Sequence, residues 1–172
     1  MGRLRIRLTY KDWLLLCFLL GILWGTAAAH FFGESAGGLR ELTGYRASDR
    51  SWETYFYVCR ARFAQLAVGW LMGLAVCSAP LFGAAAAYTG MTLAVVLSAL
   101  TEQKGILGLP VFLCAVGPQG IFYGAVWAVL AMWAGDPAKR TRLGPLALLG
   151  LLAAAGAFAE VYVSPLAAGW AL

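Results

Sequence analysis

Glu160 is a carboxylate inside an apolar run, Ala159-Glu160-Val161-Tyr162-Val163-Ser164-Pro165. A charge in such a setting costs on the order of 3 kcal/mol at the middle of a bilayer, so it needs a partner or a role. We hypothesise a structural ion pair with Arg60 or Arg62, which precede the second apolar run. Two other readings stay open: the side chain snorkels to water, or it lines a proton path by itself.

The other residues with reactive side chains are isolated in the sequence. His30 is the only histidine, and a catalytic or metal site needs converging partners. The cysteines show no CxxC spacing and have no histidine nearby, which argues against zinc or a redox pair; they are Cys17, Cys59, Cys77 and Cys114. We find no HExxH, no GxSxG and no paired carboxylates within apolar runs. We therefore expect no enzyme activity, no cofactor and no metal.

The composition indicates a bilayer as the solvent of this chain. Its residues are 62% hydrophobic and 12% charged, whereas soluble domains are about half apolar and a quarter charged. We predict an all-α, polytopic membrane helix bundle that forms a single domain over residues 1–172. The net charge of +5 comes from cations that flank the apolar runs, so we expect contact with membrane lipid and not with nucleic acid.

Apolar runs predict about five transmembrane helices, near residues 13–32, 63–79, 81–100, 119–134 and 145–165. The first run follows a basic N-terminus and ends in Ala27-Ala28-Ala29, which also fits a cleaved signal peptide. We favour a membrane span because the run exceeds the usual length of about 7 to 15 residues for a signal peptide.

Two apolar runs are too long for one span. Residues 63–100 would form a helix of about 57 Å, nearly twice the hydrocarbon core, so we predict a hairpin with its turn at Pro80. Residues 105–135 exceed one span but not two, which suggests a half-helix over about 106–116, either re-entrant or flat. The predicted helix break is Gly117, Pro118, Gln119 and Gly120. A proline kink in one tilted helix is the alternative.

Residues 33–62 form the only sizeable polar segment, and we predict that it faces outward. Within it, Trp52, Tyr55, Phe56 and Cys59 repeat at the spacing of an amphipathic helix. Its aromatic stripe either lies on the membrane surface or packs on the bundle. Because buried aromatic residues often dominate the energy of interfaces, we expect Trp52, Tyr55 and Phe56 to anchor a partner.

The distribution of cations predicts the orientation of the bundle. Four cations precede the first span and three lie in the loop 136–142, whereas charges in 33–62 nearly balance. Lysine and arginine favour the cytoplasmic side, which places the N-terminus inside and the C-terminus outside. Three GxxxG pairs predict close helix packing: Gly21/Gly25, Gly69/Gly73 and Gly120/Gly124.

With these segments assigned, the chain resembles the stage II sporulation protein M family of endospore-forming bacteria over nearly its whole length. The ending Glu160-Val161-Tyr162-Val163-Ser164-Pro165 is similar to the family's Glu-Ala-Tyr-Val-Ser/Thr-Pro. Pro118-Gln119-Gly120-Ile121 is similar to a family Pro-His-Gly-Ile, with Gln119 where histidine is frequent. Tyr123 and Ala125 stand where the family has glutamate and proline.

The resemblance implies a non-catalytic scaffold of the engulfment machinery in the cell membrane, and in sporulating cells in the engulfing mother-cell or septal membrane. Such a scaffold recruits two peptidoglycan hydrolases, stage II sporulation proteins D (a lytic transglycosylase) and P (an amidase and endopeptidase). The alternative is a permease subunit of an ABC-type transporter, with Gly117-Pro118 as the re-entrant element and Glu160 in the path. A homo-oligomer is compatible with both functions.

Overall fold

The computed structural model describes residues 9–32, 51–134, 143–164 and 166. Within these ranges every regular element is helical, which confirms the all-α class. The expectations for the N-terminal arginines, for residues 33–50, for the loop 136–142 and for Pro165 concern segments outside the described residues. The elements are α1 (Tyr10–Phe32), α3 (Trp52–Leu74), α4 (Ser78–Lys104), the 3₁₀ turn η2 (Gly105–Leu107), α5 (Gly108–Ala134), α6 (Leu143–Phe158) and the π-helical turn η4 (Ala159–Val163).

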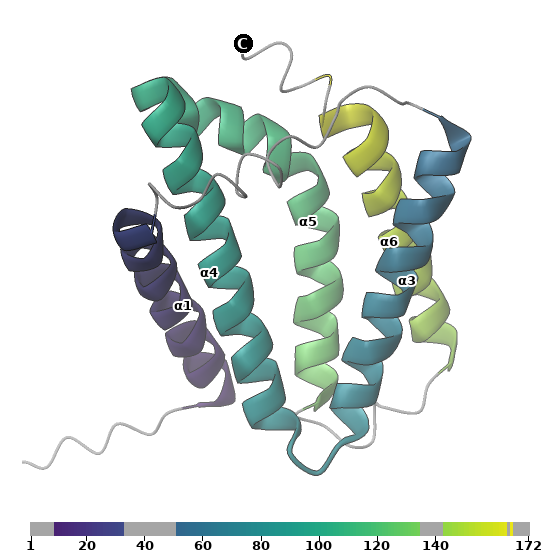
Figure 1. Ribbon diagram of the computed structural model, residues 1–172. Coiled ribbons are helices and arrows are strands. Elements are labelled where there is room, and N and C mark those ends of the chain that lie inside the picture. The colour runs from purple at the N-terminus through teal and green to yellow at the C-terminus, as the bar shows by residue number, and fades with distance from the viewer. Residues whose placement is uncertain (1–8, 33–50, 135–142, 165, 167–172) are drawn as a thin grey trace, which may run out of the picture.

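The five long helices stand side by side and alternate in direction along the chain (Figure 1). α1 lies against α4 at one edge, α3 and α6 lie together at the other, and α5 runs between α4 and that second pair. α1, α4 and α6 run in one direction, and α3 and α5 run in the other. Consequently the start of α1 and the end of η4 lie at opposite ends of the bundle, the lower and upper ends in Figure 1.

The contact between α1 and α4 depends on glycine. The two helices are parallel, because Gly21 approaches Ala87 and Gly25, one turn later, approaches Met91. A Cβ on Gly21 would overlap the Ala87 carbonyl and lie 2.8 Å from the Ala87 Cα. The pair Gly21/Gly25 therefore allows the close approach expected of GxxxG.

The turn between α3 and α4 differs from the prediction. α3 ends at Leu74, the turn spans residues 75–77, and α4 begins at Ser78. Pro80, predicted as the turn, lies in the first turn of α4. Proline is tolerated there because the first N–H groups of a helix have no intrahelical acceptor, so the residue starts the helix and does not form the bend.

The predicted half-helix over about 106–116 is not a separate element. Gly105, with a φ of 60°, and η2 turn the chain back, and α5 then runs without interruption from Gly108 to Ala134. Gly117, Pro118, Gln119 and Gly120 all lie inside this helix. Figure 1 shows that its first turns run at an angle to the rest. Proline inside a helix removes one hydrogen bond and bends the axis, so the predicted break is a kink.

The predicted outer helix is the beginning of a longer one. α3 starts at Trp52, where the Ser51 side chain accepts a hydrogen bond of 3.3 Å from the Glu53 N–H, and it continues to Leu74 without a break. The amphipathic stripe and the second apolar run therefore form one rigid element. The separate segments predicted at 33–62 and 63–79 are joined here because nothing between Trp52 and Leu74 breaks a helix.

Apolar side chains fill the bundle and also cover much of its described surface. The core joins four helices through Leu66, Phe82, Val126 and Leu149, together with Leu130 and Ala134. Outside it, Trp24 of α1 is 71% exposed and many leucines are similarly open. Three helical stretches are long and apolar enough to cross a membrane: Tyr10–Phe31, Ser78–Ala134 (which contains the turn at Gly105) and Gly144–Val163.

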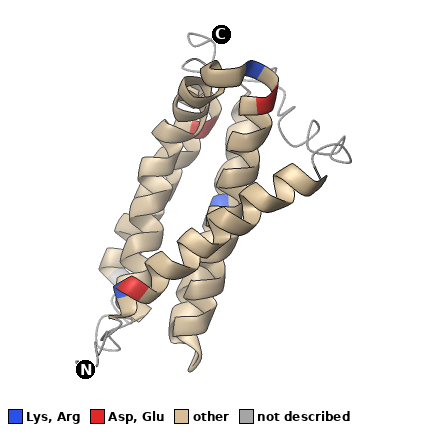
Figure 2. Ribbon diagram, turned by 90° about the vertical axis from the view of Figure 1, so that its left-hand side faces the viewer, with Lys and Arg blue, Asp and Glu red and all other residues tan. Residues whose placement is uncertain are grey.

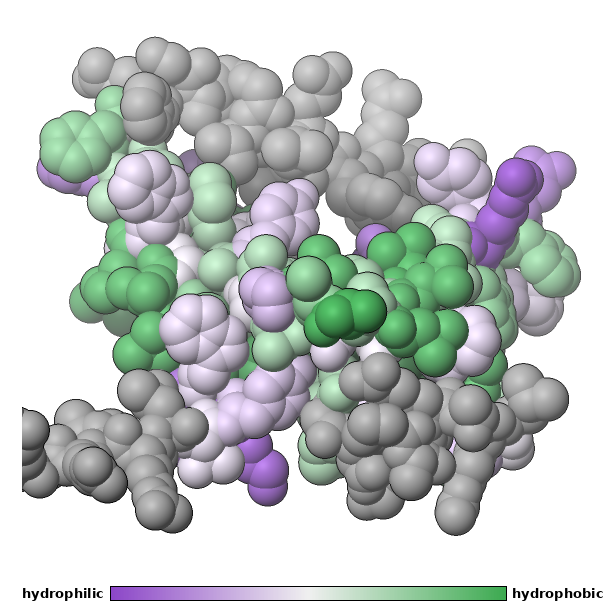
Figure 3. Space-filling view, turned by 90° about the horizontal axis from the view of Figure 1, so that it is seen from below, coloured by the Kyte–Doolittle hydropathy of each residue, from purple (hydrophilic) through white to green (hydrophobic). Residues whose placement is uncertain are grey.

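Charged residues are sparse in the described ribbon, and most lie toward the helix ends (Figure 2). Seen from below, the described part of the surface is largely green and pale, with purple only in a few places (Figure 3). The eight charged residues of the described ranges are Lys11, Asp12, Glu53, Arg60, Arg62, Glu102, Lys104 and Glu160.

Candidate functional site

Glu160 and Arg62 form a bidentate ion pair between η4 and α3. The Arg62 Nη2 lies 2.7 Å from the Glu160 Oε1, and the Arg62 Nε donates to the Oε2 at 2.9 Å. The side chains are 27% and 16% exposed, respectively. Two parallel, charge-assisted hydrogen bonds of this kind are stronger than neutral ones and fix the relative orientation of the two groups.

Helix phase explains why Arg62 faces inward. It lies one turn from Val58 and one turn from Leu66, and both are buried. Residues four apart share a helix face, so Arg62 belongs to the inner stripe of α3. Arg60 is two residues away, exposed, and has no ion pair within the described part of the chain. Of the two arginines considered for Glu160, the structure brings only Arg62 to it.

Tyr123 of α5 completes the network. Its hydroxyl donates to the Glu160 Oε2 at 2.8 Å, and its ring centroid lies 4.4 Å from the Arg62 Cζ. The same side chain thus satisfies the carboxylate and contacts the guanidinium through a cation–π interaction. Arg62 also donates to the Gln65 Oε1 at 2.9 Å. We call Arg62, Tyr123 and Glu160 the polar clamp, because they join α3, α5 and η4.

Sequence reasoning did not single out Tyr123 as a site residue. The available signals were its place in an apolar run one turn after Gln119, and its position where the resembled family has glutamate. Both marked a polar position in an apolar helix. Neither identified the partner, because that depends on how α5 packs against η4.

The polar clamp has irregular backbone and unpartnered atoms beside it. Glu160 lies in the first turn of the π-helix. Such turns are rare in proteins, and those that occur are often found at functional sites. One turn away, the Gln119 Oε1 and the Ser164 Oγ are buried and have no hydrogen-bond partner. α5 and η4 run antiparallel, so both residues lie on the same side of the contact between Tyr123 and Glu160.

Aromatic rings gather above the clamp, where α3 begins and η4 ends. The Trp52 ring lies 6.0 Å from Tyr55 and 6.4 Å from Tyr162. Tyr55 packs against the buried cluster of Val58, Ala157 and Val161 and on the Phe158 ring, so part of the predicted stripe belongs to the bundle. Trp52 and Phe56 remain 67% and 64% exposed.

The other predicted features do not converge on the clamp. His30 lies at the end of α1, which packs on α4. Among the GxxxG pairs, Gly69 approaches Trp127 and Leu130, whereas a Cβ on Gly73 or Gly124 would meet no atom within 4 Å. In the described ranges there is no group of three or more side chains suited to hold a metal ion.

Comparison with protein-family models, with curated proteins and with solved structures found no match to this chain. The resemblance to the stage II sporulation protein M family therefore depends on the motifs in the sequence. In the part of the chain that the structure describes, the fold and site define an all-helical protein in which an ion pair and a tyrosine link three elements.

Proposed function

We propose that this chain is a non-catalytic scaffold of the cell membrane that recruits peptidoglycan hydrolases at its outer end. Its partners would be stage II sporulation proteins D and P, as the motif resemblance implies. The five long helices would cross the bilayer, with the N-terminus inside and the C-terminus outside.

One observation carries the proposal: the Glu160 carboxylate is fully engaged in holding helices together. It accepts from Arg62 through both oxygens and from Tyr123 through one. A carboxylate held this way stabilises an architecture, since a reactive one needs an open position for substrate. The clamp holds α3, which carries the exposed Trp52 and Phe56, against α5 and η4, as a rigid platform for a partner requires.

The helix directions support the proposed orientation. The start of α1, the end of α5 and the start of α6 all lie at the lower end of the bundle (Figure 1). The basic N-terminus and the basic loop 136–142 attach to these helix ends. Both groups of cations would then face the cytoplasm, as the positive-inside rule requires.

Aromatic residues support a matching membrane thickness. Tryptophan and tyrosine favour the two membrane interfaces. On α3, Trp52 and Trp70 are separated by about 27 Å at 1.5 Å per residue, close to the bilayer core of about 30 Å. α3 is not among the stretches that qualify as spans by hydropathy alone. The ion pair with Glu160 offsets much of the free-energy cost of placing the charged Arg62 side chain inside the bilayer.

Copurification tests the function. The full chain, tagged at its C-terminus and solubilised from sporulating cells, should recover both hydrolases by quantitative mass spectrometry. Replacing Trp52 and Phe56 together by alanine should lower this recovery by about tenfold or more, because exposed aromatic anchors carry much of an interface's energy.

The matched control is Tyr88→Ala, which removes an aromatic ring that is similarly exposed on α4. This variant should recover both hydrolases normally. Recovery of neither hydrolase with the unmodified chain would contradict the proposal, as would full recovery with the Trp52 and Phe56 variant.

A second candidate is a permease subunit of an ABC-type transporter. It is favoured by the kink in α5 and by the two unpartnered polar atoms, the Gln119 Oε1 and the Ser164 Oγ. Bent helices with polar groups at mid-depth are common in transporters. The same purification distinguishes the candidates, since a permease should recover a cytoplasmic ATPase in place of the hydrolases.

A further inference from the structure

Arg60 is a second cation on α3, and it faces away from the bundle. It lies two residues before Arg62, so the two side chains point to nearly opposite sides of the helix. Arg60 is exposed and forms no ion pair within the described part of the chain. Phe56 and Tyr57, one turn away on the same outward face, are 64% and 76% exposed. An unpaired charge therefore lies beside aromatic side chains on the outer face of α3.

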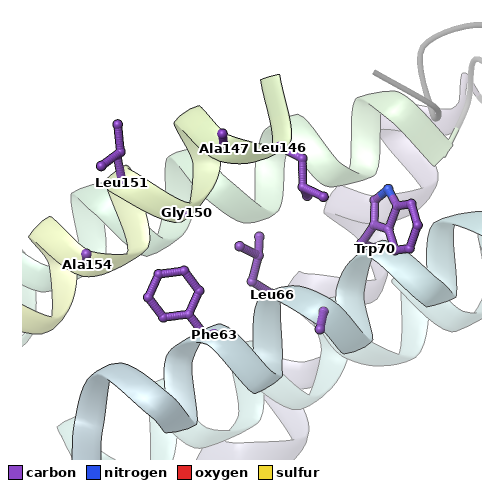
Figure 4. Close-up of a pocket in the computed structure, with 9 residues that line it drawn as sticks. Phe63, Leu66, Trp70, Leu146, Ala147, Gly150, Leu151 and Ala154 are labelled. Atoms are coloured by element: carbon purple, nitrogen blue, oxygen red, sulfur yellow. The ribbon is translucent and has the colours of Figure 1, made fainter. Parts of the chain in front are cut away.

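This outer face differs from the side of α3 that faces α6. On that side Phe63, Leu66 and Trp70 line an apolar groove, opposite small residues of α6 (Figure 4). Arg60 is not among the residues that line the groove, because its direction on the helix lies further outward. The charge therefore belongs to the outer surface of the described bundle and not to a contact between its helices.

In the proposed membrane location, the depth of Arg60 makes this exposure costly. At 1.5 Å per residue, Arg60 lies about 12 Å from Trp52 and about 15 Å from Trp70, the two residues expected at the membrane interfaces. It is therefore close to the middle of the hydrocarbon core, where a charged side chain needs a partner. A lipid phosphate does not provide one, because phosphates lie outside the core of about 30 Å. Arginines near the ends of a span snorkel to the interface, but Arg60 is about two turns from the start of α3.

A second copy of the chain also lacks a suitable partner. In the described ranges, Asp12, Glu53 and Glu102 lie within one turn of a helix end, and Glu160 is already held in the polar clamp. The sequence places the other side-chain carboxylates in polar segments outside the apolar runs. A carboxylate at the depth of Arg60 therefore has to come from another protein.

We infer that the outer face of α3 binds a transmembrane helix of another protein, and that an aspartate or glutamate of this helix pairs with Arg60. Phe56 and Tyr57 would pack against the same helix, since exposed aromatic rings offer a large apolar contact area. The inference depends on the proposed membrane location, but not on recruitment of the hydrolases. Arg62 would then join helices of this chain, whereas Arg60 would join the chain to a partner.

Energy transfer in vesicles tests this pairing with a defined probe. The full chain, labelled with a fluorescence acceptor at a C-terminal tag, is reconstituted with a synthetic helix of about 20 leucine and alanine residues that carries a donor and one central glutamate. We expect this helix to bind about tenfold more tightly than the same helix with a central leucine, as one hydrogen-bonded pair between membrane helices allows. A diazirine beside the glutamate should label residues 56–64.

Two variants and one control assign this preference to Arg60. Arg60→Gln should bind both helices equally. Lys104→Gln, which removes an exposed cation at the end of α4, should keep the tenfold preference. Arg60→Glu should prefer a helix with a central lysine over the helix with glutamate. This reversal would show that the variant chain is folded and that it binds through charge.

Flotation with the vesicles comes first, because a chain that does not float would overturn the membrane location and the inference with it. In the floated chain, equal binding of the glutamate and leucine helices would overturn the inference and mean that Arg60 snorkels to water. A preference that survives Arg60→Gln would also overturn it, since the glutamate then pairs elsewhere.

A second copy on the outer face of α3 would contradict the inference as well. It would appear as energy transfer between donor-labelled and acceptor-labelled copies of the chain that is lost in Arg60→Gln. Copurification of the hydrolases reports separately on the proposed function, so the failure of one proposal is distinguishable from the failure of the other.

Discussion

Arg62 and Glu160 neutralise each other where three helical elements meet, and Tyr123 contacts both of them. Each charge alone would be costly in this half-buried place, so each depends on the other for its stability there. The central chemical feature of the protein is therefore a pair of residues far apart in sequence. We expect the free energy of unfolding to respond to the pair as a unit.

Exchanging the two charges tests this dependence. Glu160→Arg or Arg62→Glu alone should lower the free energy of unfolding by about 3 kcal/mol, because each leaves two like charges together without a partner. Combining both substitutions restores opposite charges and should recover a large part of the loss. The measurement is unfolding of the full chain in mild detergent.

Arg60 provides the matched control for this exchange. Combining Glu160→Arg with Arg60→Glu should be no more stable than Glu160→Arg alone, because Arg60 does not contact Glu160. Rescue through Arg60 and not through Arg62 would contradict the geometry of the clamp.

The sequence singled out Glu160 but left two arginines as its partner. Both candidates lie near the same level of α3, and the phase of the helix determines which one faces inward. Arg62 continues the stripe of Val58 and Leu66, which a helical pattern extended through residue 58 would have shown. Tyr123 was not singled out because a tyrosine in an apolar helix more often marks an interface or a packed ring.

The boundaries of the helices could be predicted from the sequence only in part. The first span was predicted at 13–32, and α1 covers Tyr10–Phe32. Pro80 was predicted to form a turn and Pro118 to break a helix, but Pro80 lies in the first turn of α4 and Pro118 lies inside α5. Proline is compatible with both positions, because it is tolerated in the first turn of a helix and can bend a helix from inside. Composition predicts where a chain is helical, but a proline does not reveal whether it starts, bends or ends a helix.

The packing of α1 on α4 makes a prediction for a native cysteine. A Cβ placed on Gly83 would lie 3.1 Å from the Cys17 Sγ, close enough for a disulfide after a small adjustment of the Trp13 ring. In the Gly83→Cys variant, mild oxidation should therefore join the introduced thiol to Cys17. Loss of both thiols to maleimide labelling, with a matching mass decrease, would report the bond.

Gly124→Cys is the control for this crosslink. It introduces a thiol on α5, where a Cβ meets no neighbouring atom within 4 Å, so it should remain free after oxidation. A free thiol in both variants would contradict the parallel contact of α1 with α4.

The whole bundle has an odd number of long helices in alternating directions, so its two described ends differ in character. The lower end carries the turn between α3 and α4, and the upper end carries η2, the polar clamp and the exposed rings of Trp52 and Phe56. A scaffold that recruits partners outside the cell needs these ends on opposite sides of the membrane. That requirement is the central claim of the proposed function.

The most direct test of this claim is to find from which side of the membrane two thiols can be labelled. Cys77 is exposed in the turn before α4, and Gln103 is exposed near the other end of the same helix. Two variants each keep a single thiol. The first keeps Cys77 and has alanine in place of Cys17, Cys59 and Cys114; the second also replaces Cys77 by alanine and carries Gln103→Cys. Intact cells that contain either variant are treated with a membrane-impermeant maleimide.

We predict that intact cells label the Gln103→Cys variant at once, and that Cys77 becomes labelled only after the membrane is opened. Labelling of both positions from outside, or of neither, would mean that α4 does not cross the bilayer. Labelling of Cys77 alone would invert the bundle and place the aromatic end in the cytoplasm. Each of these results would contradict an outward-facing scaffold.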